Sequence, residues 1–178
     1  MQFKSQLLSF STIIFTLFLL SCGPSAEERK NEISEMEKAL KSPDGSLPDS
    51  VSAANAIKQY TEFVKAFPDD TLSPVYLFRG ANLAAQQADL PAAIKLLDQL
   101  HRDYPKHVDV PKALFLKGFV SETQMGDFKT AESCYREFLN EYPNHELAGD
   151  VSFSLNNLGK SPEQLLQEIS ASDTTASK

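Results

Sequence analysis

Two cysteines and three histidines are the residues of this 178-residue chain with the widest chemical repertoire. They are Cys22, Cys134, His101, His107 and His145. None of the histidines has a neighbouring cysteine or acidic residue at the spacing of a metal site. The sequence also has no Gly-x-Ser-x-Gly elbow, phosphate-cradling loop or His-Glu-x-x-His run. It therefore predicts a non-catalytic protein that needs no metal and no other cofactor.

The positions of four of these residues indicate structural roles. His107 and His145 each follow a proline by two residues, which is typical of a loop. His101 and Cys134 fall within predicted helices, beside or among apolar residues. We therefore expect a partly buried imidazole at His101 instead of a catalytic base. At Cys134 we expect a small buried residue instead of a reactive thiol.

The other cysteine follows an apolar segment. Residues 7–20 are apolar except for serine and threonine, and Lys4 precedes them. This run has the length of the hydrophobic region of a signal peptide and is too short to span a bilayer comfortably. Its ending, Leu19-Leu20-Ser21-Cys22, resembles a bacterial lipobox, and the resemblance implies cleavage after Ser21 and acylation of Cys22. The alternative is an ordinary signal peptide, or an uncleaved anchor, in which the cysteine stands by chance.

The residue after this cysteine indicates which membrane would hold the lipid anchor. Gly23, rather than aspartate, follows Cys22. This arrangement is similar to the sorting pattern of some Gram-negative lipoproteins, and it implies an outer-membrane anchor with the chain facing the periplasm. An acylated Cys22 would also leave Cys134 with no intramolecular disulfide partner.

Charge argues against nucleic acid as a partner. The chain has 17 basic and 24 acidic residues and a net charge of −7, which becomes −8 if Lys4 is removed with the signal peptide. No basic patch stands out in the sequence, whereas binding to nucleic acid depends on clustered cations.

Three segments share one helical pattern: residues 56–68, 93–105 and 131–143. Each has alanine at offset 0, bulky apolar or aromatic residues at offsets 4 and 7, an aromatic residue at offset 11 and proline at offset 12. The first four positions lie on one face of an α-helix, and the proline ends it. The alanines are 37 and then 38 residues apart. A helical signature at this period predicts an all-α fold of stacked helical hairpins, which usually binds other proteins.

Partner helices are predicted between these segments. Residues 75–80 and 113–118 align at a spacing of 38. This alignment pairs Gly80 with Gly118 inside the helices, where each glycine costs about 1 kcal/mol relative to alanine and indicates a close approach of the paired helix. It also places the extra residue of the longer period in the loop after Pro105.

The same alignment suggests residues that could contact a partner. It makes Arg79 equivalent to Lys117, so that the two could form a basic ladder facing acidic groups of a bound chain. The same groove could have apolar contacts at Phe115, Phe119 and Leu77. The alternative is that the two cations are solvated charges and that these apolar residues belong to the core between helices.

The combined pattern resembles the tetratricopeptide repeat, a family in which an A helix and a B helix pair and a proline closes helix B. The residues that match well are Gly118, Gly126-Asp127-Phe128, Ala131, Tyr135 and Pro143. Those that match less completely are Gly80, Asp89, Ala93 and Pro105. Helix A of this family has a position that holds a small residue, and either Gly118 or Phe119 could occupy it in this chain. The resemblance covers residues 26–158 and implies a right-handed superhelix of about seven helices that binds a protein or peptide.

A narrower group shares the long period and the aromatic-proline ending. It consists of envelope repeat proteins, including BamD-type lipoproteins of outer-membrane barrel assembly and the C-terminal repeat domain of CpoB-type cell-division coordinators. This chain is shorter than the five repeats typical of the first type and lacks the heptad segment that precedes the domain of the second. The resemblance implies a membrane-anchored scaffold, with a barrel-assembly subunit or a cell-division and peptidoglycan coordinator as alternatives.

These observations divide the chain into segments. Ser25 with Glu28 and Ser161 with Gln164 fit capping boxes at the starts of two helices. Gly159 is expected to cap the helix before it. The predicted segments are a signal peptide at 1–21, a lipidated tether at 22–25, a helical repeat domain at 26–158, a C-terminal helix at 159–169 and a disordered tail at 170–178.

Overall fold

The computed structural model describes residues 23–41, 44–161 and 163–167. Every regular element within these residues is helical, which confirms the all-α prediction. The predicted signal peptide, Ser21, Cys22 and the predicted tail lie outside the described residues. The helices are α2 (Ala26–Leu40), α3 (Ser50–Ala66), α4 (Ser73–Gln86), α5 (Leu90–Asp103), α6 (Val110–Thr123), α7 (Phe128–Glu141) and α8 (Ala148–Asn156). A further short helical stretch covers residues 163–167.

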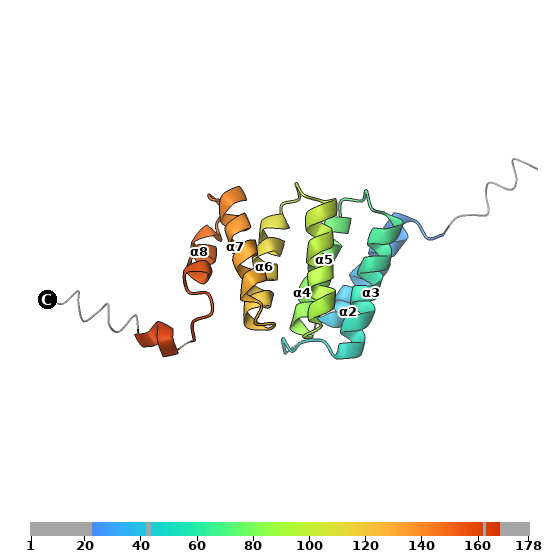
Figure 1. The fold of residues 1–178 in the computed structure, drawn as a ribbon. Helices are drawn as coiled ribbons and strands as arrows, with labels where there is room; N and C mark the ends of the chain where they lie inside the picture. Colours follow the sequence, from blue (N-terminus) through green and yellow to red (C-terminus); the bar gives the residue numbers. More distant parts are fainter. Residues whose placement is uncertain (1–22, 42–43, 162, 168–178) are drawn as a thin grey trace, which may run out of the picture.

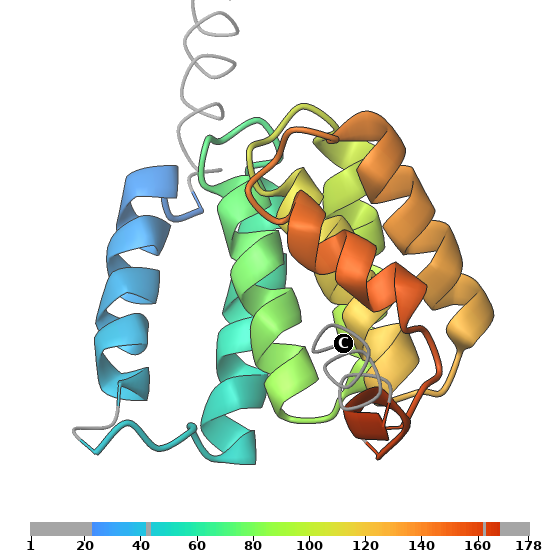
Figure 2. The same ribbon diagram turned by 90° about the vertical axis from the view of Figure 1, so that its left-hand side faces the viewer.

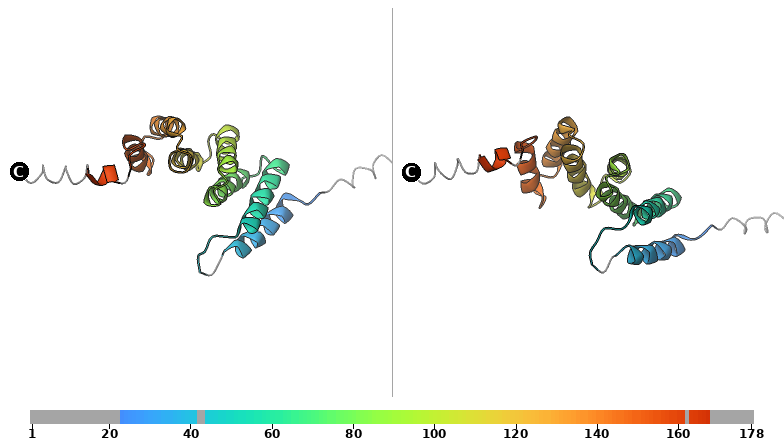
Figure 3. Two further views of the ribbon diagram at one scale, coloured as in Figure 1. Left: turned by 60° about the horizontal axis from the view of Figure 1, so that its bottom comes forward. Right: turned by 90° about the horizontal axis from the view of Figure 1, so that it is seen from below.

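The helices stack in two layers. They follow one another in a row from α2 at one end to α8 at the other (Figure 1). Figure 3 shows α2, α4, α6 and α8 in one layer, here called the A layer, and α3, α5 and α7 in the other, the B layer. Packing is most extensive between α4 and α5 and between α6 and α7, so these pairs form the predicted hairpins. Figure 2 looks along the row and shows α8 lying over α6 and α7.

The B-layer helices begin and end where local signals predict. An aspartate caps each one, because its side chain accepts hydrogen bonds from backbone amides of the first turn. These caps are Asp49, Asp89 and Asp127. Each helix ends at an aromatic C-cap, and the backbone φ angles of Phe67, Tyr104 and Tyr142 are −133°, −132° and −128°. The proline that follows each C-cap cannot continue the helix.

The predicted face of each B-layer helix is buried. Ala56, Ala93 and Ala131, the residues at offset 0, are all 0% exposed. The residues at offset 7, which are Phe63, Leu100 and Phe138, are also 0% exposed. The small residues allow the A layer to approach closely, and the large ones fill the space between neighbouring hairpins.

The A-layer helices α4 and α6 repeat every 37 residues, not every 38. They begin at Ser73 and Val110, and each has proline at its second position. The extra residue of the longer period lies in the turn between the two helices of a hairpin. Residues 87–89 join α4 to α5, whereas residues 124–127 join α6 to α7. The prediction that this residue falls after Pro105 is wrong, because the loops between the B-layer helices and the helices that follow them have equal length.

This register shows which residue of α6 occupies the position that the repeat pattern reserves for a small side chain. Gly118 is buried, and a Cβ atom built on it would lie 2.5 Å from Cε1 of Tyr135. Phe119 is 44% exposed and does not compete for that position. At a period of 37 the counterpart of Gly118 is Ala81, which is 0% exposed. Gly80 is therefore not its equivalent, although its own Cβ would lie 3.2 Å from Cδ1 of Leu96.

Both hairpin turns contain a left-handed residue just before the capping aspartate. Gly126 has a φ of +66°, and Ala88 at the matching place has a φ of +58°. We expect Ala88→Gly to raise the free energy of unfolding by about 0.5–1 kcal/mol, because glycine relieves the left-handed strain at a cost in chain entropy. Ala88 is exposed, so the change removes no buried surface.

Chemical denaturation of the two matched variants tests this expectation. Gly126→Ala should shift the denaturation midpoint in the opposite direction to Ala88→Gly, because it introduces the same strain. A lower midpoint for Ala88→Gly would show that the alanine is not strained in this turn.

The two ends of the row confirm the predicted capping boxes. The Glu28 amide donates to Ser25 Oγ at 3.2 Å, and the Ser25 amide donates to Glu28 Oε2 at 2.7 Å. Ser161 and Gln164 make the same reciprocal pair at 3.3 and 2.8 Å. The expected cap at Gly159 is wrong, because α8 ends at Asn156 with Asn157 as its C-cap.

Candidate partner-binding groove

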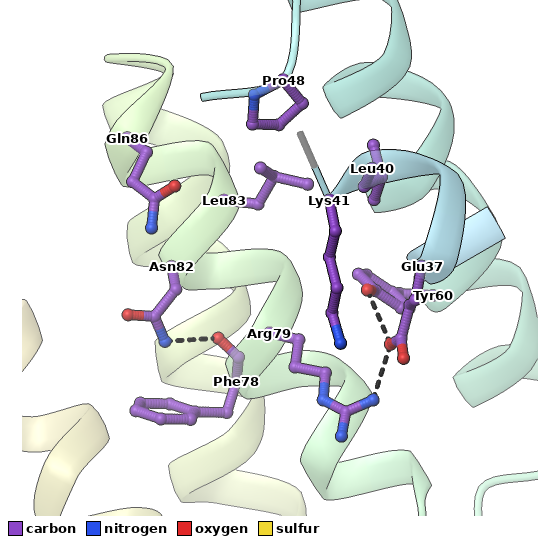
Figure 4. A pocket seen from close by; sticks show the side chains of 10 residues that line it. All are labelled: Glu37, Leu40, Lys41, Pro48, Tyr60, Phe78, Arg79, Asn82, Leu83 and Gln86. Carbon is purple, nitrogen blue, oxygen red and sulfur yellow. Dashed lines mark hydrogen bonds and ion pairs between the residues drawn. The ribbon is translucent and has the colours of Figure 1, made fainter. Parts of the chain in front are cut away.

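A groove of about 540 Å³ lies between α2 and α4. Figure 4 shows it from close by, with α2 on one side, α4 on the other and the loop before α3 at one end. It is lined by Glu37, Leu40, Lys41, Pro48, Tyr60, Phe78, Arg79, Asn82, Leu83 and Gln86. The lining combines apolar side chains with amide and charged groups, which suits a ligand that has both a polar backbone and apolar side chains.

One carboxylate joins three helices beside the groove. Glu37 Oε1 accepts a hydrogen bond from the Tyr60 hydroxyl at 2.9 Å and forms an ion pair with Arg79 Nη1 at 2.6 Å (Figure 4). Burial raises the pKa of Tyr60, and the hydrogen bond to Glu37 raises it further. The phenol therefore remains a donor at neutral pH. This network fixes α2, α3 and α4 relative to one another and so sets the shape of the groove.

The two cations predicted to form a ladder are both in ion pairs, and they face different layers. Arg79 pairs with Glu37 of α2 in the A layer, whereas Lys117 Nζ lies 2.6 Å from Asp98 Oδ1 of α5 in the B layer. Burial alone would lower the pKa of Lys117, but its hydrogen bond and charge interaction with Asp98 raise it. The prediction that Arg79 and Lys117 are equivalent is wrong, because at a period of 37 the counterpart of Arg79 is Leu116. Direct contact of either cation with a partner stays a prediction.

Phenylalanine, not a cation, recurs at equivalent positions of the A layer. Phe78 of α4, Phe115 of α6 and Phe153 of α8 are 37 and 38 residues apart, as are the starts of these helices. The first two are half-buried, and Phe153 is 59% exposed. Phe119 lies one turn after Phe115, with its ring centroid 6.4 Å away. We call Phe78, Phe115, Phe119 and Phe153 the phenylalanine row.

In both α4 and α8 the residue one turn after the repeated phenylalanine is an asparagine that makes the same hydrogen bond. Asn82 Nδ2 donates to the carbonyl of Phe78 at 2.8 Å, and Asn157 Nδ2 donates to the carbonyl of Phe153 at 2.8 Å. Figure 4 shows Phe78, Asn82 and Gln86 along one side of α4. Sequence reasoning singled out Phe115, Phe119 and Leu77 but not Phe78 or Phe153. Leu77 is 1% exposed and belongs to the core, whereas contact of Phe115 and Phe119 with a partner stays a prediction. The prolines Pro74 and Pro111, which are 37 residues apart, were the signal for the correct register.

Comparison with known families agrees with this geometry. The family model described as tetratricopeptide repeat matches residues 112–145, which cover most of α6, all of α7 and the loop after it. Residues 112–145 are thus similar to one tetratricopeptide repeat. No curated protein matches the chain. The tetratricopeptide repeat is a scaffold for protein partners, and the match indicates no enzyme family.

His107, His145 and Cys134 have structural roles, and the His101 side chain is partly buried, as expected. His107 Nδ1 accepts from the Asp109 amide at 3.3 Å, and His145 Nδ1 accepts from the Leu147 amide at 3.1 Å. The loop prediction for both histidines is therefore confirmed. Cys134 is 3% exposed, and burial raises the pKa of its thiol to about 11, so the reactive thiolate is scarce at neutral pH.

No helix in the described part of the chain is both long and apolar enough to cross a membrane. The candidate lipidation site at Cys22 and the cleavage site after Ser21 lie outside that part and stay predictions.

Proposed function

We propose that the protein is a lipid-anchored, non-catalytic scaffold of the bacterial envelope whose A layer binds an extended segment of a partner protein. The observation that carries this proposal is the phenylalanine row, which presents one aromatic position in each of three successive A-layer helices. Phe78 and Phe115 pack partly against the core and Phe153 is exposed, and aromatic side chains are enriched at protein–protein interfaces. The tetratricopeptide repeat supports the same class of function.

The groove favours an extended peptide over a folded domain. Its volume of about 540 Å³ is that of a small-ligand site and holds a few side chains. Asn82 and Gln86 place side-chain amides on its wall, and an amide can both donate to and accept from a peptide backbone. Phe78 and Leu83 provide apolar surface for the side chains between those backbone groups.

Crosslinking in intact cells tests the binding face. A photoreactive residue at position 86, in the groove, should capture a partner protein, whereas one at Ser133, exposed on α7 of the B layer, should not. The double variant Phe119→Ala/Phe153→Ala should lower capture from position 86 by about tenfold or more, because it removes two candidate hot spots. Both side chains are exposed, so helicity should not change.

The control variant is Met125→Ala, which removes a similarly exposed apolar side chain (49%) from a hairpin turn. It should leave capture unchanged. Equal capture from positions 86 and 133, or no effect of the double variant, would contradict the proposed binding face. Charge reversal at Arg79 is a poorer test, because it would also break the pair with Glu37 that shapes the groove.

The lipid anchor is supported by the sequence alone, through Cys22 and the apolar run before it. Fractionation of the same cells tests it. Cys22→Ser should abolish incorporation of labelled palmitate and move the protein from the outer-membrane fraction, whereas an ordinary signal peptide predicts the same distribution for both proteins.

A further inference from the structure

A cluster of three potential metal ligands joins two helices of the B layer. His101 lies in the last turn of α5, and Glu137 and Glu141 lie one turn apart at the end of α7. One ligand atom from each residue lies within 4.8 Å of the other two. His101 Nε2 and Glu137 Oε1 are 3.7 Å apart, which is too long for a hydrogen bond between them. The cluster is thus open enough to admit an ion.

The surrounding charges leave this end of α7 in need of a cation. Glu141 is the last residue of α7, and the last turn of that helix has no basic residue. The C-terminus of a helix carries the negative end of its dipole, so two carboxylates there are unfavourable without a cation. Lys117 is the nearby candidate, but its ammonium group is bound to Asp98 at 2.6 Å. Most carboxylates in ion pairs elsewhere in the described chain have a lysine or arginine partner. Glu137 instead has the imidazole at 3.7 Å and a longer-range charge interaction with Lys117.

We propose that His101, Glu137 and Glu141 bind one divalent transition-metal ion, with Zn²⁺ as the best fit. Zinc bonds to imidazole nitrogen at about 2.0–2.1 Å and to carboxylate oxygen at about 2.0–2.2 Å, so ligand atoms of a tetrahedral site are about 3.3–3.6 Å apart. The present separations are 3.7 Å for His101 Nε2 to Glu137 Oε1 and at most 4.8 Å for the other pairs, so the ligand atoms need to approach one another by roughly 1 Å. An imidazole ligand favours zinc over magnesium or calcium, which prefer oxygen ligands only.

Two carboxylates neutralise the charge of the ion, and a water molecule completes the tetrahedron. The ion would link α5 of one hairpin to α7 of the next. These helices lie in the same layer of the stack (Figure 3). The bound metal would therefore limit movement between the two hairpins.

Calorimetric titration of the full chain with ZnCl₂ tests the site. We expect one zinc ion per chain, and a dissociation constant raised at least tenfold by His101→Ala or by Glu137→Gln. Magnesium should not compete. The control variant is Glu132→Gln on the same helix, whose carboxylate pairs with Arg136, and its affinity should match that of the unaltered chain. Thermal unfolding supplies a second readout, because zinc should raise the Tm of the unaltered chain but not of His101→Ala.

Absence of saturable zinc binding by the unaltered chain would overturn the proposal. So would equal zinc affinity in the unaltered chain and in both ligand variants, because binding would then involve other groups, such as Cys22. The result is independent of the proposed function, since the cluster lies in the B layer and the phenylalanine row in the A layer.

Discussion

Gly118→Ala should lower the free energy of unfolding by about 2 kcal/mol, through overpacking between α6 and α7. The new Cβ atom would lie 2.5 Å from Cε1 and 2.8 Å from Cδ1 of Tyr135. That ring cannot easily give way. It is 0% exposed, and its hydroxyl donates to Glu122 Oε2 at 2.8 Å, so moving the ring also strains a hydrogen bond between the two helices. Urea denaturation followed by circular dichroism measures the loss.

Alanine substitutions at two other helical glycines provide the comparison for this result. A Cβ atom added to Gly149 of α8 would have no neighbouring atom within 4 Å, so Gly149→Ala should raise stability by up to about 1 kcal/mol, the gain in helix propensity. Gly80→Ala should fall between the two, because its nearest neighbour is Cδ1 of Leu96 at 3.2 Å, the end of a flexible side chain. If Gly118→Ala were as stable as Gly149→Ala, close approach would not explain the glycine in α6.

Val151→Asp should be more damaging still, lowering the free energy of unfolding by about 3 kcal/mol or more. Val151 is the buried residue of α8 and is 0% exposed. It belongs to the apolar cluster that includes Tyr135 and Phe138 of α7. An aspartate there must either bury a charge or take up a proton, and both cost free energy. The expected consequence is loss of the cap that α8 places over the last hairpin.

The matched control lies two residues further along the same helix. Phe153 is 59% exposed, so Phe153→Asp should change the free energy of unfolding by less than about 1 kcal/mol. The comparison separates burial from a general effect of charge in α8. Similar losses for the two variants would show that α8 does not close the stack through Val151. Thermal denaturation monitored by circular dichroism distinguishes these outcomes.

The B-layer helices were predictable to within about a residue, because their signals are local. An apolar face at offsets 0, 4, 7 and 11, a capping aspartate and a closing proline all act within one helix, and none depends on a distant residue. The pattern at residues 56–68, for example, places the end of its helix just before Pro68, and the observed helix ends at Ala66 with Phe67 as its C-cap. The same reasoning placed the loop histidines, whose turns follow directly from the closing prolines.

The register of the A layer was not predictable in this way. The helix α6 has buried residues on several sides, since it contacts α5 as well as α7, and its apolar residues therefore define no single face. Aligning Gly80 with Gly118 was consequently as plausible as aligning Pro74 with Pro111. This one-residue error makes Arg79 and Lys117 equivalent in the predicted alignment. In the structure the equivalent residues are Phe78 and Phe115. Those two cations in fact pair with Glu37 and Asp98.

The sequence by itself determined an all-α protein of stacked hairpins, the boundaries of its B-layer helices and, as a prediction, a lipid anchor at Cys22. These follow from patterns within single helices and from the order of residues around one cysteine. Only the tertiary structure decided which side chains of different helices meet. The phenylalanine row depends on the register of the A layer, and the cluster of His101, Glu137 and Glu141 depends on the distance between α5 and α7. Residues 36 and 40 positions apart have no local signal that brings them together, and only packing of the intervening helices does so.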